Sequence, residues 1–278
     1  MRRLYAGPWV GEFGWEICSW NPAIRHIAED YDHITVEIQP GMEYLYEFAD
    51  TIITNPHLPN FDMYSGKVSK PEFKPPNGTE SIIPRLFWRS HARAEFRAIS
   101  HVNGNYQPPP KKWREYGTEK PRKVADIMCA WRGKKEYKNR SFPEKQYPDK
   151  HCIALTKLFL KAGYSVACYG GKDNLYVDGT LDFRGVSLVE LCGALSRADL
   201  VVGPSSGTIH MASLCGAPHI TWFGKYSNSM DRYLSYWNPF ETPVTFIGGN
   251  YPPTPEKVFQ HGIERMDQNT KNLEWVSR

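Results

Sequence analysis

The sequence predicts an α/β protein built from parallel, doubly wound sheets. Three observations support this class. Short apolar runs alternate with amphipathic helical segments, glycine-marked turns join them, and 278 residues suffice for about two domains. With 41% hydrophobic and 23% charged residues, the composition is that of a globular protein, which excludes collagen-like, coiled-coil and disordered classes.

The first half opens with strand and helix patterns in turn. Ile17, Trp20, Ile24 and Ile27 recur near helical spacing, after a glycine-marked loop over 7–14. The predicted elements are a strand at 4–6, a helix at 15–29, a strand at 33–38, a short helix at 42–49 and a strand at 51–53. The Pro-, Asn- and Gly-rich stretch that follows is longer than most loops, which favours a functional role or partial disorder.

A basic segment follows this loop. Residues 85–99 are predicted to form a helix with Arg85, Arg89, Arg93 and Arg97 spaced four apart along one side. Aromatic residues lie between and beyond these arginines, as in proteins that meet a polyanion or unstacked bases. The arginines are therefore candidates for binding an anionic acceptor, and a solvated helix face is the alternative.

Charge and proline content divide the chain. Between positions 85 and 145 there are 16 Lys and Arg against 6 Asp and Glu, although the whole chain carries only +4, and this asymmetry suggests an anionic partner. Proline-rich segments lie where few contacts cross. The predicted divisions are a first domain at 1–105, a linker at 106–122, a second domain at 123–245 and a tail at 246–278 that packs back on the first domain.

The second half shows repeated β-α-β patterns with short turns. Ser187 and Glu190 form a capping box, which explains Glu190 without a catalytic role. The predicted elements are strands at 124–131, 164–169, 200–202 and 218–223, a helix that Gly163 closes, a helix after Ser187 and a short helix that carries His210.

The strand at 200–202 runs into a Gly/Ser turn and then directly into a helix. Backbone N–H groups at a helix start bind phosphate. The candidates for this contact are Ser205, Ser206, Gly207, Thr208 and, one turn later, His210. The alternative is a capped helix with a core histidine.

The run VVGPSSGTIHMASLCGAPHITWFG, with DFRGVSLVEL upstream, resembles the signature of the glycosyltransferase family 9 heptosyltransferases. Gly170 and Gly171 stand where the family has its glycine turn. The resemblance covers about 125–224 and implies the GT-B fold, with two Rossmann-like domains facing across a cleft. It also implies a nucleotide-sugar donor on the C-terminal domain, an acceptor on the N-terminal one, and no cofactor or obligatory metal. Ser205 departs from the family, which usually has an acidic residue there.

Two further sets of residues follow from the resemblance. Arg132 and Arg140, in the basic loop after the strand at 124–131, resemble the family's donor-phosphate contacts, with a solvated loop as the alternative. Glu12 follows a glycine as the family's catalytic acid does, and Glu16 lies at a similar distance before Pro22. Glu12 is the first candidate for the general base and Glu16 the second.

The resulting hypothesis is a metal-independent, inverting glycosyltransferase of the hexosyl or heptosyl type. Its acceptor hydroxyl belongs to an anionic molecule, a modified DNA base or a phosphorylated glycan. Two alternatives stay open: a nucleic-acid-binding protein that keeps the fold without turnover, and a nucleotide-sugar epimerase that uses residues such as Asp182, His210 and Glu12.

The sequence also predicts a cytoplasmic protein. It lacks a signal-peptide pattern and any apolar window long enough to span a membrane. The six cysteines form no C-x-x-C pair and lie in apolar surroundings, so disulfides and zinc are not expected. The oligomeric state is left open.

Overall fold

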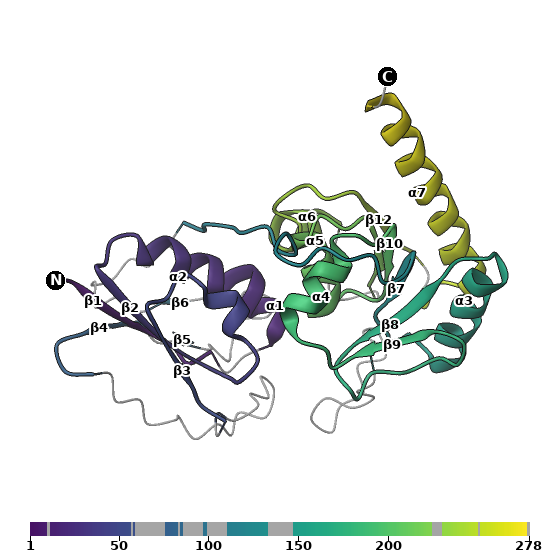
Figure 1. Cartoon of the computed structure of the whole chain (residues 1–278). Coiled ribbons are helices and arrows are strands. Elements are labelled where there is room, and N and C mark those ends of the chain that lie inside the picture. Colours follow the sequence, from purple (N-terminus) through teal and green to yellow (C-terminus); the bar gives the residue numbers. More distant parts are fainter. Residues whose placement is uncertain are drawn as a thin grey trace. The chain divides into compact units, whose positions relative to one another are not determined.

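The computed structural model describes residues 1–9, 12–56, 58, 76–82, 84–85, 97–98, 110–132, 147–223, 230–249 and 251–276. The chain forms two compact units, Met1–Arg114 and Glu115–Arg278 (Figure 1). Each contains its own parallel sheet, as expected for the predicted fold class.

The first unit is built on a four-stranded sheet in the order β3-β2-β1-β4, with every neighbouring pair parallel. Its strands are β1 (Arg3–Ala6), β2 (His33–Ile38), β3 (Thr51–Thr54) and β4 (Glu80–Ile82). Its helices are α1 (Phe13–Trp15), the π-helix η1 (Glu16–Trp20), α2 (Asn21–Ala28) and the 3₁₀-helix η2 (Glu43–Tyr46). The three strands expected at the start of the chain are confirmed.

The helix expected over 15–29 forms, but η1 interrupts it. The backbone N–H of Asn21 bonds the carbonyl of Glu16, five residues back, which is the π-helical spacing. Pro22 has no N–H to offer the carbonyl of Cys18, four residues before it. The Lys111 ammonium donates to that carbonyl at 3.1 Å. The proline therefore leaves the Cys18 carbonyl, two residues after Glu16, without its helical N–H donor.

The helix expected over 85–99 is wrong at both ends. Pro84–Arg85 and Arg97–Ala98 are instead the strands β5 and β6, which pair antiparallel with Arg85 opposite Arg97. Like charges four residues apart repel each other on a helix, so the spacing of these arginines disfavours a helix. Arg89 and Arg93 lie outside the described residues.

Residues 110–114, in the predicted linker, are bound tightly within the first unit. The backbone N–H of Lys112 donates to the carbonyl of Pro22 at 2.9 Å. The Arg114 guanidinium lies 2.6 Å from the Glu47 carboxylate and donates to the carbonyl of Tyr44 at 3.1 Å. These cations serve the fold and are not a free basic patch.

Residues 115–122 belong to the second unit in the same way. The N–H of Tyr116 donates to the carbonyl of Leu214, and the N–H of Arg122 to that of Gly193. A Cβ on Gly193 would lie 1.9 Å from the carbonyl oxygen of Lys120. This segment passes so close to a helix that only glycine fits beneath it.

Replacing Gly193 with alanine is expected to destabilise the protein by about 1–3 kcal/mol, because the new methyl group must push away backbone. Urea unfolding measures the loss. Gly248→Ala is the matched control, since the nearest atom to its Cβ lies 3.9 Å away on Phe246. Equal stabilities for the two variants would contradict the close approach.

The second unit is built on a six-stranded, fully parallel sheet in the order β12-β11-β10-β7-β8-β9. Its strands are β7 (Ile127–Cys129), β8 (Val166–Gly170), β9 (Leu181–Arg184), β10 (Leu200–Val202), β11 (His219–Trp222) and β12 (Val244–Ile247). The chain moves outward from β7 to β9, returns to the centre at β10 and moves outward again. Strand order therefore switches between β7 and β10.

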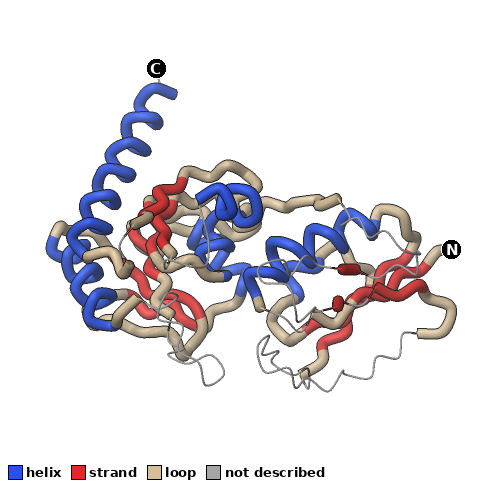
Figure 2. The backbone as a smooth tube through the Cα atoms, turned by 180° about the vertical axis from the view of Figure 1, so that it is seen from behind, coloured by secondary structure: helices blue, strands red, loops and turns tan. Residues whose placement is uncertain are grey.

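Helices cover both faces of this sheet (Figure 2). They are α3 (Asp149–Lys161), α4 (Leu188–Leu195), α5 (Gly207–Leu214), α6 (Met230–Trp237) and α7 (Pro255–Val276). The capping box expected at α4 is confirmed, since the Ser187 hydroxyl accepts from the N–H of Glu190 and the Glu190 carboxylate accepts from the N–H of Ser187.

The last helix, α7, packs on α3. Its side chains Val258 and Met266 lie in the core of the second unit, whereas the tail was expected to pack on the first domain. Arg265 holds α7 to the edge strand β12: its guanidinium donates to the Val244 carbonyl at 3.1 Å and to the Thr245 hydroxyl at 2.8 Å.

Candidate functional site

The candidate phosphate site lies where β7 and β10 end, at the switch in strand order. In parallel sheets of this kind, ligands bind beyond the carboxyl ends of the strands at such a switch. Gly203 follows β10, and a Cβ there would lie 2.8 Å from the carbonyl oxygen of Ala130, which follows β7. The absent side chain lets the two loops approach, and the N–H of Ser205 bonds the carbonyl of Trp222 at 3.1 Å.

The start of α5 is open to solvent. Residues 205–208 are half-buried, between a buried strand and a buried helix body. The first N–H groups of a helix have no acceptor within it, and they carry the positive end of the helix dipole. The hydroxyls of Ser206 and Thr208 lie 2.8 Å apart, and Ser206 caps no backbone N–H with its side chain. The turn therefore offers backbone and hydroxyl donors together.

His210 supports this turn from behind. Its Nε2 lies 3.0 Å from the Ser205 hydroxyl, and its ring stacks on Trp237 with centroids 4.2 Å apart and planes within 7°. Only 6% of the residue is exposed. His210 therefore orients the Ser205 side chain. Because the rest of its ring is buried, most of the residue is also part of the core, as the alternative prediction had it. Tyr169, on β8, donates to the carbonyl of Thr208 at 3.1 Å.

A second buried histidine, His219, lies near Tyr233, whose ring also lies near His210. The Nε2 of His219 lies 2.7 Å from the hydroxyl of Tyr233, and its Nδ1 lies 2.9 Å from the carbonyl of Ala217. Because Nδ1 must donate to the carbonyl, the neutral ring accepts from the tyrosine at Nε2. Burial lowers the pKa of His219 from 6.5 to about 4, so it stays neutral in the folded protein above that pH.

Of the two arginines expected to contact the diphosphate of the sugar donor, the structure describes Arg132 alone. Arg132 directly follows the buried Trp131, beyond the end of β7, and is half-buried, so it lies on the same edge of the sheet as the start of α5. Arg140 lies outside the described residues.

Gly170 and Gly171 shape the turn after β8. Gly170 has a φ of +121° and its carbonyl accepts from the N–H of Gly185 at 2.7 Å. A Cβ on Gly170 would lie 2.0 Å from the amide nitrogen of Asn174, whose side chain bonds the carbonyl of Tyr169. The turn geometry alone thus accounts for Gly170, whereas a Cβ on Gly171 would meet only the Asp173 carboxylate, at 2.7 Å.

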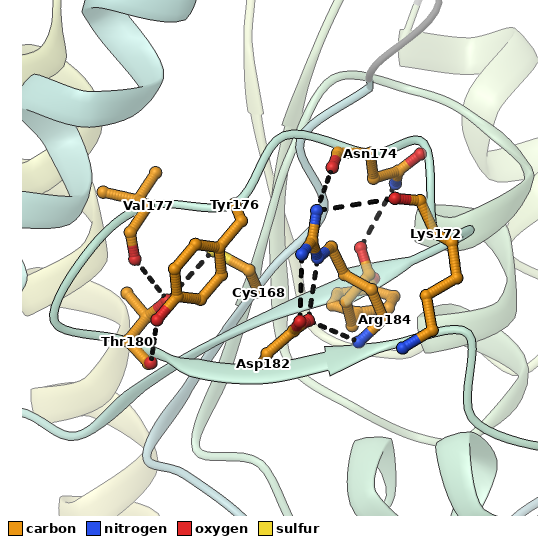
Figure 3. Close-up of polar contacts among 9 residues, drawn as sticks. Cys168, Lys172, Asn174, Tyr176, Val177, Thr180, Asp182 and Arg184 are labelled. Atoms are coloured by element: carbon orange, nitrogen blue, oxygen red, sulfur yellow. Dashed lines mark hydrogen bonds and ion pairs between the residues drawn. The ribbon is translucent and has the colours of Figure 1, made fainter.

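Arg184 braces the loop that follows this turn (Figure 3). Its guanidinium bonds both carboxylate oxygens of Asp182, at 2.7 and 2.9 Å, and the carbonyl of Asn174 at 2.7 Å. It also lies 5.1 Å from the centre of the Tyr176 ring. Arg184 lowers the pKa of Asp182 well below its usual value. An ionised, doubly bound carboxylate is poorly suited to proton exchange, which disfavours the epimerase reading for Asp182.

The two candidate bases lie in the first unit, after β1. Glu12 stands at the start of α1 and its side chain is half-buried. Its backbone carbonyl accepts from the indole N–H of Trp9 at 3.3 Å and from the N–H of Trp15 at 3.0 Å.

Glu16 is the first residue of η1, and only 6% of it is exposed. The fully buried Tyr46 donates from its hydroxyl to Glu16 Oε1 at 2.9 Å. Burial raises the pKa of Glu16 from 4.5 to about 7, and the Tyr46 hydrogen bond opposes part of that rise. A carboxylate that titrates near neutrality suits a general base.

Three supporting residues were not foreseen from the sequence. They are Tyr46, Tyr169 and Trp237, which contact Glu16, Thr208 and His210. Each comes from a distant part of the chain, so no local spacing marks it. The sequence offers one weak hint, since a buried tyrosine usually needs a hydrogen-bond partner for its hydroxyl.

Other expectations concern metals, thiols and membranes. Among the described residues, no three His, Cys, Asp or Glu side chains gather as a metal ion would require. All six cysteines are described, and each is free and buried. No helix within the described ranges has the length and apolar character of a membrane span.

Several solved structures similar to this chain are glycosyltransferases. The glycosyl transferase family 9 protein from Veillonella parvula DSM 2008 matches with a TM-score of 0.56 and 14% identity, over 96% of this chain and 98% of that one. E. coli ADP-heptose LPS heptosyltransferase II matches with a TM-score of 0.56 and 14% identity, over 97% and 100%. E. coli heptosyltransferase WaaC with ADP gives 0.55 and 13%, over 95% and 100%. No family model and no curated protein matches the sequence.

Proposed function

We propose, from the GT-B fold that this chain shares with the family 9 glycosyltransferases, that it moves a sugar from a nucleoside-diphosphate donor to an acceptor hydroxyl. One observation carries the proposal. The half-buried Ser205–Thr208 turn opens α5 at the switch in strand order, where such folds bind nucleotides.

The second unit is proposed to bind the donor. Its diphosphate would accept hydrogen bonds from the N–H groups at the start of α5 and from the hydroxyls of Ser206 and Thr208, with Arg132 as the cation. As the bond to the sugar breaks, negative charge grows on the departing diphosphate. Donors already fixed in place stabilise that charge, so the turn would act most strongly in the transition state.

The first unit is proposed to supply the general base. Glu16 is preferred over Glu12 because burial places its pKa near neutrality and Tyr46 orients it. The carboxylate would take the proton from the acceptor hydroxyl as the oxygen attacks the anomeric carbon opposite the leaving group. The proposal includes inversion of the anomeric centre and no requirement for a metal.

The acceptor is proposed to be anionic. The support for this is the register of β5 and β6, which pairs one basic residue, Arg85, with another, Arg97. The cations of Lys111, Lys112 and Arg114, by contrast, bind Cys18, Glu29 and Glu47 within the first unit. Because these cations are already paired, they give less support to the alternative function, a protein that binds nucleic acid without turnover.

Binding of nucleoside diphosphates tests the donor site directly. A thermal-shift panel of ADP, GDP, UDP, CDP and dTDP, each with EDTA and with magnesium, should show one nucleotide raising Tm by several degrees without metal. Arg132→Gln should weaken that nucleotide by about 10–100-fold, because it removes a charged hydrogen-bond donor to phosphate.

Lys161→Gln is the matched control, since it removes an exposed cation at the far end of α3. Its affinity should equal that of the unmodified protein. No shift with any nucleotide, or equal losses in the two variants, would count against the proposed donor site. A shift that needs magnesium would contradict metal independence, and a retained anomeric configuration in the product would contradict inversion.

A further inference from the structure

The carboxylate of Glu16 is held at one oxygen. Tyr46 donates to Oε1 at 2.9 Å, while the residue lies buried at the start of the π-helix. Tyr46 itself is fully buried. A hydroxyl bound to one carboxylate oxygen fixes the plane of the group and leaves the second oxygen for a proton.

The backbone on both sides of Tyr46 is fixed as well. The carbonyl of Leu45 accepts from the side-chain amide of Asn21 at 2.5 Å and from the Arg25 guanidinium at 3.2 Å. Arg25 also binds both carboxylate oxygens of Glu47, at 2.5 and 2.9 Å. Since α2 supplies Asn21 and Arg25 directly after η1, the helix that begins with Glu16 also positions its tyrosine.

The end of the first unit joins this arrangement. Arg114 lies 2.6 Å from Glu47 and donates to the carbonyl of Tyr44 at 3.1 Å. Residues 44, 45 and 47 are therefore all bound by side chains from other elements. The Tyr46 hydroxyl thus has a defined place, set by contacts that lie away from Glu16.

We propose that Tyr46 is a positioning residue for Glu16, which holds Oε1 so that Oε2 takes the proton from the acceptor hydroxyl. This inference rests on the proposed function, because it assigns the base of the same reaction. One proton moves from the acceptor hydroxyl to Oε2, while the hydroxyl oxygen bonds the anomeric carbon and the nucleoside diphosphate leaves. Tyr46 keeps its own proton throughout and acts through Glu16.

Three cations of the described part of the chain near η1 have other partners. Arg25 on α2 and Arg114 bind Glu47, which follows η2. Lys111 donates to the carbonyl of Cys18. The titratable side chain that acts on Glu16 is Tyr46. Removing its hydroxyl is therefore expected to change the titration of Glu16 through one lost hydrogen bond.

Tyr46→Phe tests the proposal in the full-length protein. A hydrogen bond to the ionised carboxylate lowers the pKa of Glu16, so its loss should raise that pKa by about one unit. The acidic limb of the kcat/KM profile should move to higher pH by the same amount, and kcat at pH 7 should fall. Tyr31→Phe is the matched control, because Tyr31 donates to Glu80 at 2.7 Å on the exposed surface.

A second readout needs no turnover. Urea unfolding from pH 5 to 9 gives the free energy of unfolding of four proteins: the unmodified protein, Glu16→Gln, Tyr46→Phe and the double variant. The difference that Glu16→Gln makes is then compared with and without the Tyr46 hydroxyl. The gain grows above the unfolded pKa of Glu16 and levels off at its folded pKa, so the pH at which it levels off reports the folded pKa. It should be about one unit higher in Tyr46→Phe, and Tyr31→Phe should leave it in place.

The two readouts separate the two ideas. Unmoved unfolding curves and an unmoved pH profile in Tyr46→Phe would overturn the positioning role. If the unmodified protein transfers no sugar from any donor, the proposed function fails, and the unfolding curves alone decide whether Tyr46 controls the Glu16 carboxylate. Shifts in both readouts, absent from Tyr31→Phe, support the full proposal.

Discussion

Replacing Glu16 with glutamine is expected to stabilise the protein at pH 8 by up to about 3 kcal/mol and to lower its transfer rate by about 10²–10⁴-fold. The folded pKa of about 7 lies above the usual 4.5, so the folded state binds a proton that the unfolded state releases between those values. Stability is therefore lost as the pH rises through about 7. Glutamine accepts the Tyr46 hydrogen bond without carrying a charge, which removes that loss.

Urea unfolding at pH 8 and pH 4.5 checks this result. The gain should be present at pH 8 and nearly absent at pH 4.5, where Glu16 is protonated in the folded protein. Glu12→Gln is the control for stability, because this half-buried side chain should change the free energy of unfolding by no more than about 0.5 kcal/mol. Loss of transfer in Glu12→Gln with normal transfer in Glu16→Gln would identify Glu12 as the base.

Acid is expected to destabilise the protein through His219 by up to about 3 kcal/mol. Its folded pKa of about 4 lies below the usual 6.5, so between these values the unfolded chain binds a proton that the folded protein refuses. The contribution of His219 is complete above pH 6.5 and is lost as the pH falls to about 4. The variant His219→Gln should remove this slope, because its amide oxygen can accept from Tyr233 without titrating.

The slope is best measured in the Glu16→Gln background. Glu16 and His219 contribute opposite slopes between about pH 4.5 and 6.5, so they largely cancel in the unmodified protein. In Glu16→Gln, the unfolding free energy should fall steadily from pH 6.5 to 4. The double variant should be nearly flat, and His26→Gln, at a half-buried position, should leave the slope unchanged. A slope that survives His219→Gln would refute its assignment.

Much of the second unit could be predicted because its signals are local. Leu200–Val202 is an uninterrupted apolar run before a Gly/Ser turn, and the Ser187 and Glu190 pair marks the start of α4. Such patterns depend on neighbours within a few residues. The edge strands β9 and β12 were missed. Asp182 and Arg184 make β9 polar, whereas the β-branched and aromatic run Val244–Ile247 of β12 carries an ordinary strand signal that was overlooked.

The candidate base shows where sequence reasoning ends. Spacing before Pro22 singled out Glu16 as the second choice, but nothing local distinguishes it from Glu12. Its burial depends on the π-helix and on Tyr46, thirty residues away. Likewise, the arginine spacing at 85–97 resembled a helix, although β5 and β6 pair across it. In both cases contacts between distant residues decided the outcome.

Arg265 has a consequence for the behaviour of the chain in concentrated solution. An edge strand exposes unpaired backbone groups, which invite another molecule to extend the sheet. At β12 the Arg265 guanidinium donates a hydrogen bond to the carbonyl of Val244, and α7 packs against the same strand. The terminal helix therefore also guards the protein against intermolecular β-pairing, and a chain that ended before it would tend to aggregate.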